Sequence, residues 1–147
     1  MQLMNLSALV RVFIIHLTFI TASFGQTAMN DQVTKIVNEI ATTNRYDESY
    51  TIGIGGIIST QYQLFQQLAQ LATPQQLVDL INHKNAVVRL YAYQALRRKK
   101  VKISEGIMTD FANDRTLITV LRGCIMEQQP VSMLINHKLI ATYKASN

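Results

Sequence analysis

Histidine and cysteine are the side chains that most often bind metal ions or act as nucleophiles, and this chain has few of them. Its 147 residues include three histidines and one cysteine. His83 and His137 each lie in the sequence Leu-Ile-Asn-His-Lys, at 80–84 and 134–138. No carboxylate or cysteine is grouped with either histidine in a zinc-binding pattern, so we expect no metal site. The repeated sequence is either a chance identity or the end of the first helix in two related units.

The acidic residues are scattered along the chain rather than paired. Enzymes that use general acid–base catalysis hold two titratable groups close together. The chain also has no Gly-x-Ser-x-Gly and no His-Glu-x-x-His motif. The sequence therefore predicts no catalytic residue and no cofactor, and an enzyme whose site assembles from distant positions stays open as an alternative. The acids are Asp31, Glu39, Asp47, Glu48, Asp79, Glu105, Asp110, Asp114 and Glu127.

Cys124 is the single cysteine, so it cannot form a disulfide within the chain. Its spacing from Leu117, Val120 and Leu121 is that of residues on one face of a helix. A free cysteine on such a face behaves as a small hydrophobic side chain. We therefore expect Cys124 to be buried and not to act as a nucleophile.

Three glycines fall within four positions, at Gly53, Gly55 and Gly56. Glycine-rich loops can bind phosphate groups, but this one lacks the Gly-Lys-Ser/Thr ending of a P-loop and the third glycine of a dinucleotide site. Glycine at this density disfavours a helix, and the preceding residues alternate between apolar and small or polar types. We interpret residues 45–59 as an extended connection that packs its apolar side chains under the helices.

A basic run follows the middle of the chain, with Arg97, Arg98, Lys99, Lys100 and Lys102 in six positions. Cations at the last turn of a helix interact favourably with the helix dipole, and this alone accounts for the run as a solvated helix end. The alternative is an anionic contact with membrane lipid, an acidic protein or a glycan. We expect no nucleic-acid partner, because no aromatic residues interleave the cations as in a single-strand binding surface.

The segment 73–96 predicts two helices joined by a tight turn. Thr73 is a helix N-cap, with Pro74 at the first helical position and Gln76 where a capping box places a glutamine. A polar turn at 82–85 ends the first helix, and the second begins at about Ala86.

The second of these helices carries a recognisable pattern, Asn85-Ala86-Val87-Val88-Arg89, followed by Ala92 and Ala95-Leu96. It resembles the second half of a HEAT repeat, and the wider segment is similar to small secreted HEAT-like proteins of bacteria. The resemblance implies an all-α fold, a short αα-superhelix of stacked helix pairs that binds proteins or peptides in a groove. It implies a bracing role for Arg89, and solvent-facing Arg89, Tyr93 and Arg97 as candidate partner-binding residues.

Apolar residues at helical spacing predict further helices, five to seven in all, with the glycine-rich segment as the one extended connection. Besides the central pair, helices are expected at about 31–43, 60–72, 105–112, 114–128 and 131–137. The expected N-caps of the first four are Asn30 or Asp31, Ser59 or Thr60, Ser104, and Asn113 or Asp114.

The amino terminus has the pattern of an export signal. The apolar run Val12–Ile20 is shorter than the ~20 residues that span a bilayer, and it suits the hydrophobic part of a signal peptide. We predict a signal peptide at 1–25, and a single HEAT-like helical domain at 26–147. The alternatives are an uncleaved membrane anchor through residues 6–22 and an ordinary helix.

Composition favours a folded chain, because 48% of residues are hydrophobic and 16% are charged. The net charge of +5 falls to +4 when Arg11 is removed with the signal (5 − 1), which is too mild to identify a partner. We therefore expect an exported interaction or scaffold protein, periplasmic or secreted, that binds another protein or peptide without catalysis. The alternatives are a membrane-surface protein held by its amino terminus and the basic run, and an enzyme.

Overall fold

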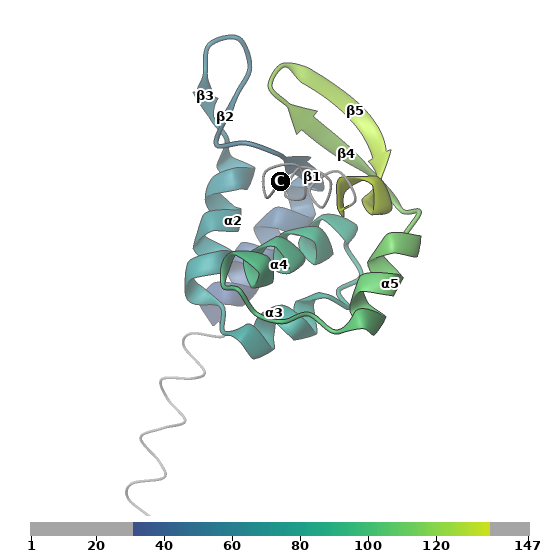
Figure 1. Cartoon of the computed structure of the whole chain (residues 1–147). Helices are drawn as coiled ribbons and strands as arrows, with labels where there is room; N and C mark the ends of the chain where they lie inside the picture. The colour runs from purple at the N-terminus through teal and green to yellow at the C-terminus, as the bar shows by residue number, and fades with distance from the viewer. Residues whose placement is uncertain (1–30, 136–147) are drawn as a thin grey trace, which may run out of the picture.

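A computed structural model of the chain describes residues 31–135. The predicted signal peptide at 1–25, the alternative anchor at 6–22 and the residues from 136 onward lie outside this part. The described elements are a helix at residues 31–43, β1 (Arg45–Asp47), β2 (Thr51–Ile52), β3 (Ile57–Ile58), α2 (Thr60–Leu71), α3 (Pro74–Leu80), α4 (Ala86–Arg98), α5 (Glu105–Asn113), β4 (Leu117–Arg122), β5 (Ile125–Pro130) and a helical turn at 131–135 (Figure 1).

The helical part agrees with the sequence, including its caps. The Ser59 hydroxyl accepts a hydrogen bond from the backbone N–H of Tyr62 at the start of α2. Thr73 and Gln76 form the predicted capping box of α3. The side chain of Asn85 caps α4, and that of Ser104 caps α5. These starts are local features of the sequence, which explains why they were predictable.

The expectation of an all-α superhelix is wrong, because the chain is a mixed α/β fold. Strands β1, β4 and β5 form a three-stranded sheet in the order β1-β4-β5, in which β1 is parallel to β4 and β5 is antiparallel to it. Strands β2 and β3 form a separate antiparallel pair. The described part is therefore a cluster of helices with two β-hairpins at one end (Figure 1).

The error lies in the segment predicted as a helix at 114–128. Ile118, Thr119 and Val120 are consecutive β-branched residues, which favour a strand. Gly123 has a φ of 58° and lies in the two-residue turn between β4 and β5. In this hairpin Cys124 is exposed at the turn, so its predicted burial is also wrong.

Helix α4 is the centre of the hydrophobic core. Its residues Leu90, Tyr91 and Leu96 are fully buried, and α2 and α3 both pack against it. The ring of Tyr91 stacks on Phe65 of α2 at 5.2 Å and lies 5.0 Å from the ring of Tyr46 in β1. The aromatic contacts thus join the sheet to two helices through α4.

The glycine-rich segment is not helical, as expected, but it folds back on itself as the β2–β3 hairpin instead of forming one extended connection. It also does not pack its apolar residues under the helices. Ile54 is 99% exposed and Ile57 is 67% exposed in the β2–β3 hairpin. The hairpin stands beside the β4–β5 hairpin at one end of the molecule (Figure 1). The backbone N–H of Gly53 donates to the carbonyl of Gly123 at 2.9 Å, so the two turns are in direct contact.

Candidate functional site

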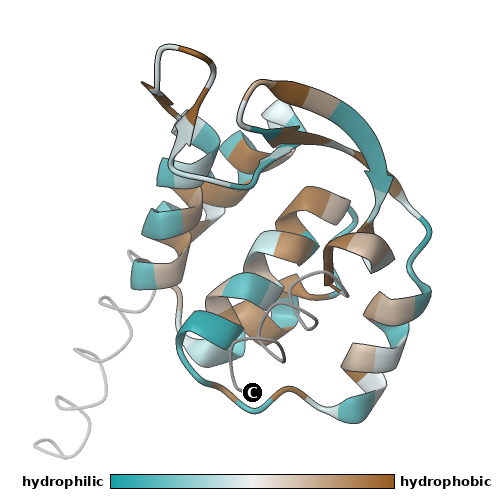
Figure 2. Cartoon of the chain, turned by 45° about the horizontal axis from the view of Figure 1, so that its top comes forward, coloured by the Kyte–Doolittle hydropathy of each residue, from teal (hydrophilic) through white to brown (hydrophobic). Residues whose placement is uncertain are grey.

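The two adjoining hairpins present a group of exposed apolar side chains, which we call the hairpin face. Figure 2 shows hydrophobic residues on both hairpins, away from the helical core. Large apolar side chains that stay exposed together at one end of a protein can mark an interaction site. The hairpin face consists of Tyr50, Ile54, Ile57 and Ile58 from the first hairpin, and Ile125 and Met126 from the second.

The base of the first hairpin is held by a buried carboxylate. Asp47 is 0% exposed, and its side chain accepts hydrogen bonds from the Arg45 guanidinium at 2.6 and 3.0 Å and from the Ser59 hydroxyl at 2.6 Å. Ser59 is the N-cap of α2, and its backbone N–H donates to the carbonyl of Tyr50 at 2.8 Å. These bonds fix both ends of the intervening hairpin to the helical core.

Two buried tyrosines extend this arrangement into α4. The Tyr91 hydroxyl accepts from the backbone N–H of Asp47 at 2.9 Å and donates to its carbonyl at 3.2 Å. The side-chain amide of Gln94 donates to the hydroxyl of Tyr46. Burial raises the pKa of both tyrosines far above the usual value, so both are neutral at physiological pH. We call Arg45, Asp47, Ser59 and Tyr91 the hairpin clamp.

Charged side chains also connect the two hairpins to each other. The Arg122 guanidinium of β4 bonds Glu48, which precedes β2, at 2.5 Å and lies 3.5 Å from Glu127 of β5. The hydrogen bond with Glu48 raises the pKa of Arg122. Residues 45–58 and 117–130 together contain two arginines and three acids, a net charge of −1 (2 − 3). The hairpin end is therefore apolar and slightly acidic.

A second candidate region lies at the turn between α3 and α4. A hollow of about 410 Å³ is lined by Ile81, Asn82, His83, Lys84, Arg89, Asp110, Phe111 and Asp114. Arg89 donates to the carbonyls of His83 and Lys84, at 2.9 and 3.1 Å, and to the carboxylate of Asp114 at 2.7 Å. The guanidinium thus joins the α3–α4 turn to the end of α5.

Asp114 has a pKa below its usual value. Burial alone would raise the pKa, but hydrogen bonds from Thr116 and the contact with Arg89 outweigh it. Both groups are thus engaged in a structural ion pair. His83 accepts a hydrogen bond from the backbone N–H of Asn85 through Nδ1 at 3.1 Å, which serves the start of α4. We find no pair of groups in this hollow arranged for proton transfer.

The predicted partner-binding residues do not form one surface. Tyr93 is 2% exposed and packs against Phe111, with ring centroids 5.1 Å apart, so the expectation that it faces solvent is wrong. Arg89 lies in the first turn of α4, and Arg97 lies in the last, with its guanidinium 6.0 Å from the Tyr93 ring. Their binding role stays a prediction, although their positions do not support a common groove.

The basic run closes α4 and leads into α5. The Arg98 guanidinium lies 5.1 Å from the centre of the Phe65 ring. Lys100 has a φ of 57°, and the N–H of Val101 donates to the carbonyl of Leu96, which ends the helix in a Schellman arrangement. Lys102 is exposed, and Lys99 is partly exposed. In both views this loop lies at the end of the molecule opposite the hairpins (Figures 1 and 2).

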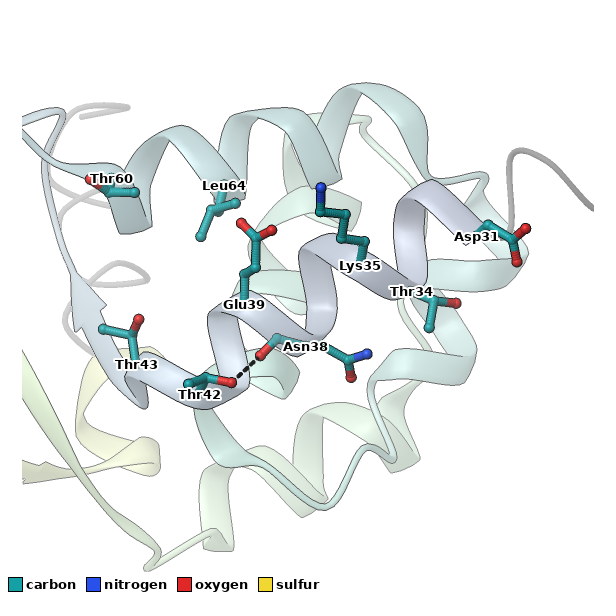
Figure 3. Close-up of a pocket in the computed structure, with 9 residues that line it drawn as sticks. All are labelled: Asp31, Thr34, Lys35, Asn38, Glu39, Thr42, Thr43, Thr60 and Leu64. Atoms are coloured by element: carbon teal, nitrogen blue, oxygen red, sulfur yellow. Dashed lines mark hydrogen bonds between the residues drawn. The ribbon is translucent and has the colours of Figure 1, made fainter.

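A second hollow, of about 580 Å³, lies between the helix at 31–43 and α2 (Figure 3). Its lining is mainly threonine, asparagine and oppositely charged side chains, and Lys35 and Glu39 project from the same helix toward α2. The hydroxyl of Thr42 donates to the carbonyl of Asn38 at 2.8 Å. The hollow is open, and its geometry indicates no particular chemistry.

Within residues 31–135 no cluster of three histidine, cysteine or acidic residues could hold a metal ion. Across the same residues, no helix has the length and apolar character required to cross a membrane. No protein-family model, curated protein or solved structure matches the chain. The hairpin face and its clamp are therefore the best-supported candidate site, on geometry alone.

Proposed function

We propose that this protein binds another protein through the hairpin face, and that it acts as an interaction protein rather than an enzyme. The observation that carries the proposal is the exposed apolar surface of two hairpins that touch at Gly53 and Gly123. A folded chain usually buries such residues, because burying one large aliphatic side chain contributes about 1.5–3 kcal/mol. The same side chains become a source of binding energy when a partner covers them.

The hairpin clamp supports this function because it reduces the cost of ordering the surface on binding. A flexible loop loses conformational entropy when a partner fixes it, whereas a preorganised surface loses less. Here the buried Asp47 carboxylate and Ser59 hydroxyl fix the base of the first hairpin, and the Gly53 N–H fixes its tip. Ile54 thus projects from a supported turn, in the manner of an interface anchor residue.

The arrangement of charge favours a protein partner over a membrane. The lysines of the basic run lie in the loop after α4, at the end of the molecule opposite the hairpin face, so one flat lipid surface does not contact both these lysines and the hairpin face (Figure 1). The hairpin end itself has a net charge of −1 (2 − 3) from its arginines and acids, which gives it no attraction to anionic lipid. Export of the protein stays a prediction.

Cross-linking and affinity capture from the native cell test this proposal, with the full chain as bait. The double variant Ile54→Ser/Ile57→Ser removes two exposed anchors without touching the core. Met133→Ser is the matched control, because Met133 is also half exposed but lies in the helical turn at 131–135. We expect one partner to be recovered about tenfold less with the double variant and equally with the control.

Equal recovery by the double variant would show that the hairpin face is not the binding surface. Binding of the wild-type chain to phosphatidylcholine–phosphatidylglycerol vesicles, lost on charge reversal at Arg98 and Lys102, would favour the membrane-surface alternative instead.

A further inference from the structure

Strand β5 lies at the edge of its sheet, and its pairing with β4 determines which backbone groups point outward. The two-residue turn makes Arg122 and Ile125 a hydrogen-bonded pair, and such pairs alternate along an antiparallel ladder. Met126 and Gln128 therefore direct their N–H and C=O groups away from β4. The neighbouring strand supports this alternation, because the carbonyl of Leu121, which is opposite Met126, accepts a bond from Glu48 on the far side of β4.

The outward groups of Met126 and Gln128 have no backbone partner among the described residues. Proteins usually protect such an edge with lysine, proline or a bulge. Strand β5 contains no lysine, and its only proline is Pro130 at the end far from the turn. The edge thus offers two N–H and two C=O groups in the spacing that another strand requires.

The side chains along this edge are short of hydrogen-bond donors and positive charge. The Oε1 atom of Gln129 is buried and has no donor among the described residues. Its Nε2 donates to the Glu127 carboxylate at 2.6 Å. A single guanidinium, that of Arg122, serves both Glu127 and Glu48. A cationic side chain brought to this face would find the partly exposed Glu127 carboxylate as its acceptor.

We propose that β5 accepts an extended segment of the partner protein as an added strand. The segment pairs with the outward backbone groups of Met126 and Gln128. It places a lysine or arginine beside Glu127, and an apolar residue on the opposite face of the sheet beside Met126, which is exposed. This inference rests on the proposed function and specifies how the partner is recognised, by strand addition at a sheet edge.

Charge distinguishes this occupant from a second copy of the chain. Two copies joined edge to edge would bring together two hairpin ends that each carry a net charge of −1 (2 − 3), with both Glu127 side chains close to the shared edge. Like charges across neighbouring strands are unfavourable. A basic extended segment supplies the missing charge, whereas a second copy does not.

Peptide binding to the full chain tests the inference. The probes are eight-residue peptides in which valine alternates with lysine, threonine or glutamate, followed by fluorescence anisotropy. We expect the lysine peptide to bind about tenfold more tightly than the glutamate peptide. The whole chain has a net charge of +5, which disfavours a lysine peptide, so this preference reports the local carboxylates.

Two variant pairs separate backbone from side-chain recognition. Met126→Pro and Gln128→Pro remove an outward N–H without removing a bond to β4, whereas Met126→Ala and Gln128→Ala keep it. We expect each proline variant to weaken lysine-peptide binding about fivefold or more relative to its alanine partner. In the unmodified chain, the peptide should slow hydrogen exchange at the amides of Met126 and Gln128.

Equal binding by the proline and alanine variants, unchanged amide exchange, or no binding of any peptide would overturn the strand-addition proposal. The proposed function would still stand if Ile54→Ser/Ile57→Ser reduced partner capture. Dimerisation of the chain alone, abolished by Met126→Pro in sedimentation measurements, would identify a second copy as the occupant and also contradict the proposal.

Discussion

The helical core and the hairpin end are stabilised in different ways. Around α4, apolar side chains such as Leu90 and Leu96 are fully buried, and packing accounts for the arrangement. At the hairpin end, Ile54 and Ile57 remain exposed, and a buried carboxylate with its hydrogen bonds fixes the backbone. The contrast applies to the first hairpin and to β5, because β4 of the second hairpin packs Ile118 and Val120 into the core. The apolar residues that stay exposed on the hairpins are available to a partner.

Removing the carboxylate of the hairpin clamp should have the largest effect on stability. Asp47→Ala leaves the buried Ser59 hydroxyl and the partly exposed Arg45 guanidinium without their acceptor. We expect the free energy of unfolding to fall by about 3 kcal/mol, because hydrogen bonds to a charged group contribute about 1.5–3 kcal/mol each. Urea denaturation measures it.

Glu48→Ala is the control, because Glu48 is partly exposed and its ion pair with Arg122 is near the surface. It should cost less than about 1 kcal/mol. Equal losses for Asp47→Ala and Glu48→Ala would show that the clamp is no more important than a surface ion pair.

A smaller loss of stability is expected when the hydrogen bonds between the Tyr91 hydroxyl of α4 and the backbone of Asp47 are removed. Tyr91→Phe keeps the ring in the core but removes the hydroxyl that bonds both backbone groups of Asp47. We expect a loss of about 1–3 kcal/mol, because a buried N–H is left unsatisfied. Tyr62→Phe should be nearly neutral, since the Tyr62 hydroxyl has no hydrogen-bond partner in the described part of the chain. A similar loss in thermal unfolding for both variants would refute the role of the Tyr91 hydroxyl.

The ion pair between Arg89 at the start of α4 and Asp114 should make stability depend on acid pH. The pKa of Asp114 is lower in the folded chain than its usual 3.8, so its contribution is present above that value and is lost as pH falls through the folded pKa. Asp114→Asn should therefore cost about 1 kcal/mol at pH 7 and less at pH 2.5. An unchanged difference between wild type and variant at the two pH values would contradict this assignment.

The smallest effect is expected at the basic run. Lys100 has a φ of 57°, a conformation that glycine adopts without strain. Lys100→Gly should therefore stabilise the chain by about 0.5–1 kcal/mol, while Lys102→Gly should not. Partner capture should be unaffected in both, because the run lies away from the hairpins. Reduced capture by either variant would show that the basic run is part of the binding surface.

The parts of the fold that follow from neighbouring residues were predictable. The capping box of Thr73 and Gln76 and the polar turn before Ala86 specify helix ends within a few residues. The non-helical character of the glycine-rich segment was predictable for the same reason, although its hairpin and the exposure of Ile54 were not.

The β4–β5 hairpin was missed because its apolar spacing fits two structures. Leu117, Val120 and Leu121 have helical spacing, whereas Ile118 and Val120 alternate as in a strand. The β-branched run and Gly123 were the signals that favoured the strand. The clamp had no local signal at all, because Asp47, Ser59 and Tyr91 are brought together only by the tertiary fold.

The central claim is that the hairpin face serves binding and not stability, and one variant tests it directly. Ile54→Ser/Ile57→Ser should leave the free energy of unfolding within about 0.5 kcal/mol of wild type, as surface substitutions usually do, while partner capture falls about tenfold. Full capture by this stably folded variant would contradict the claim.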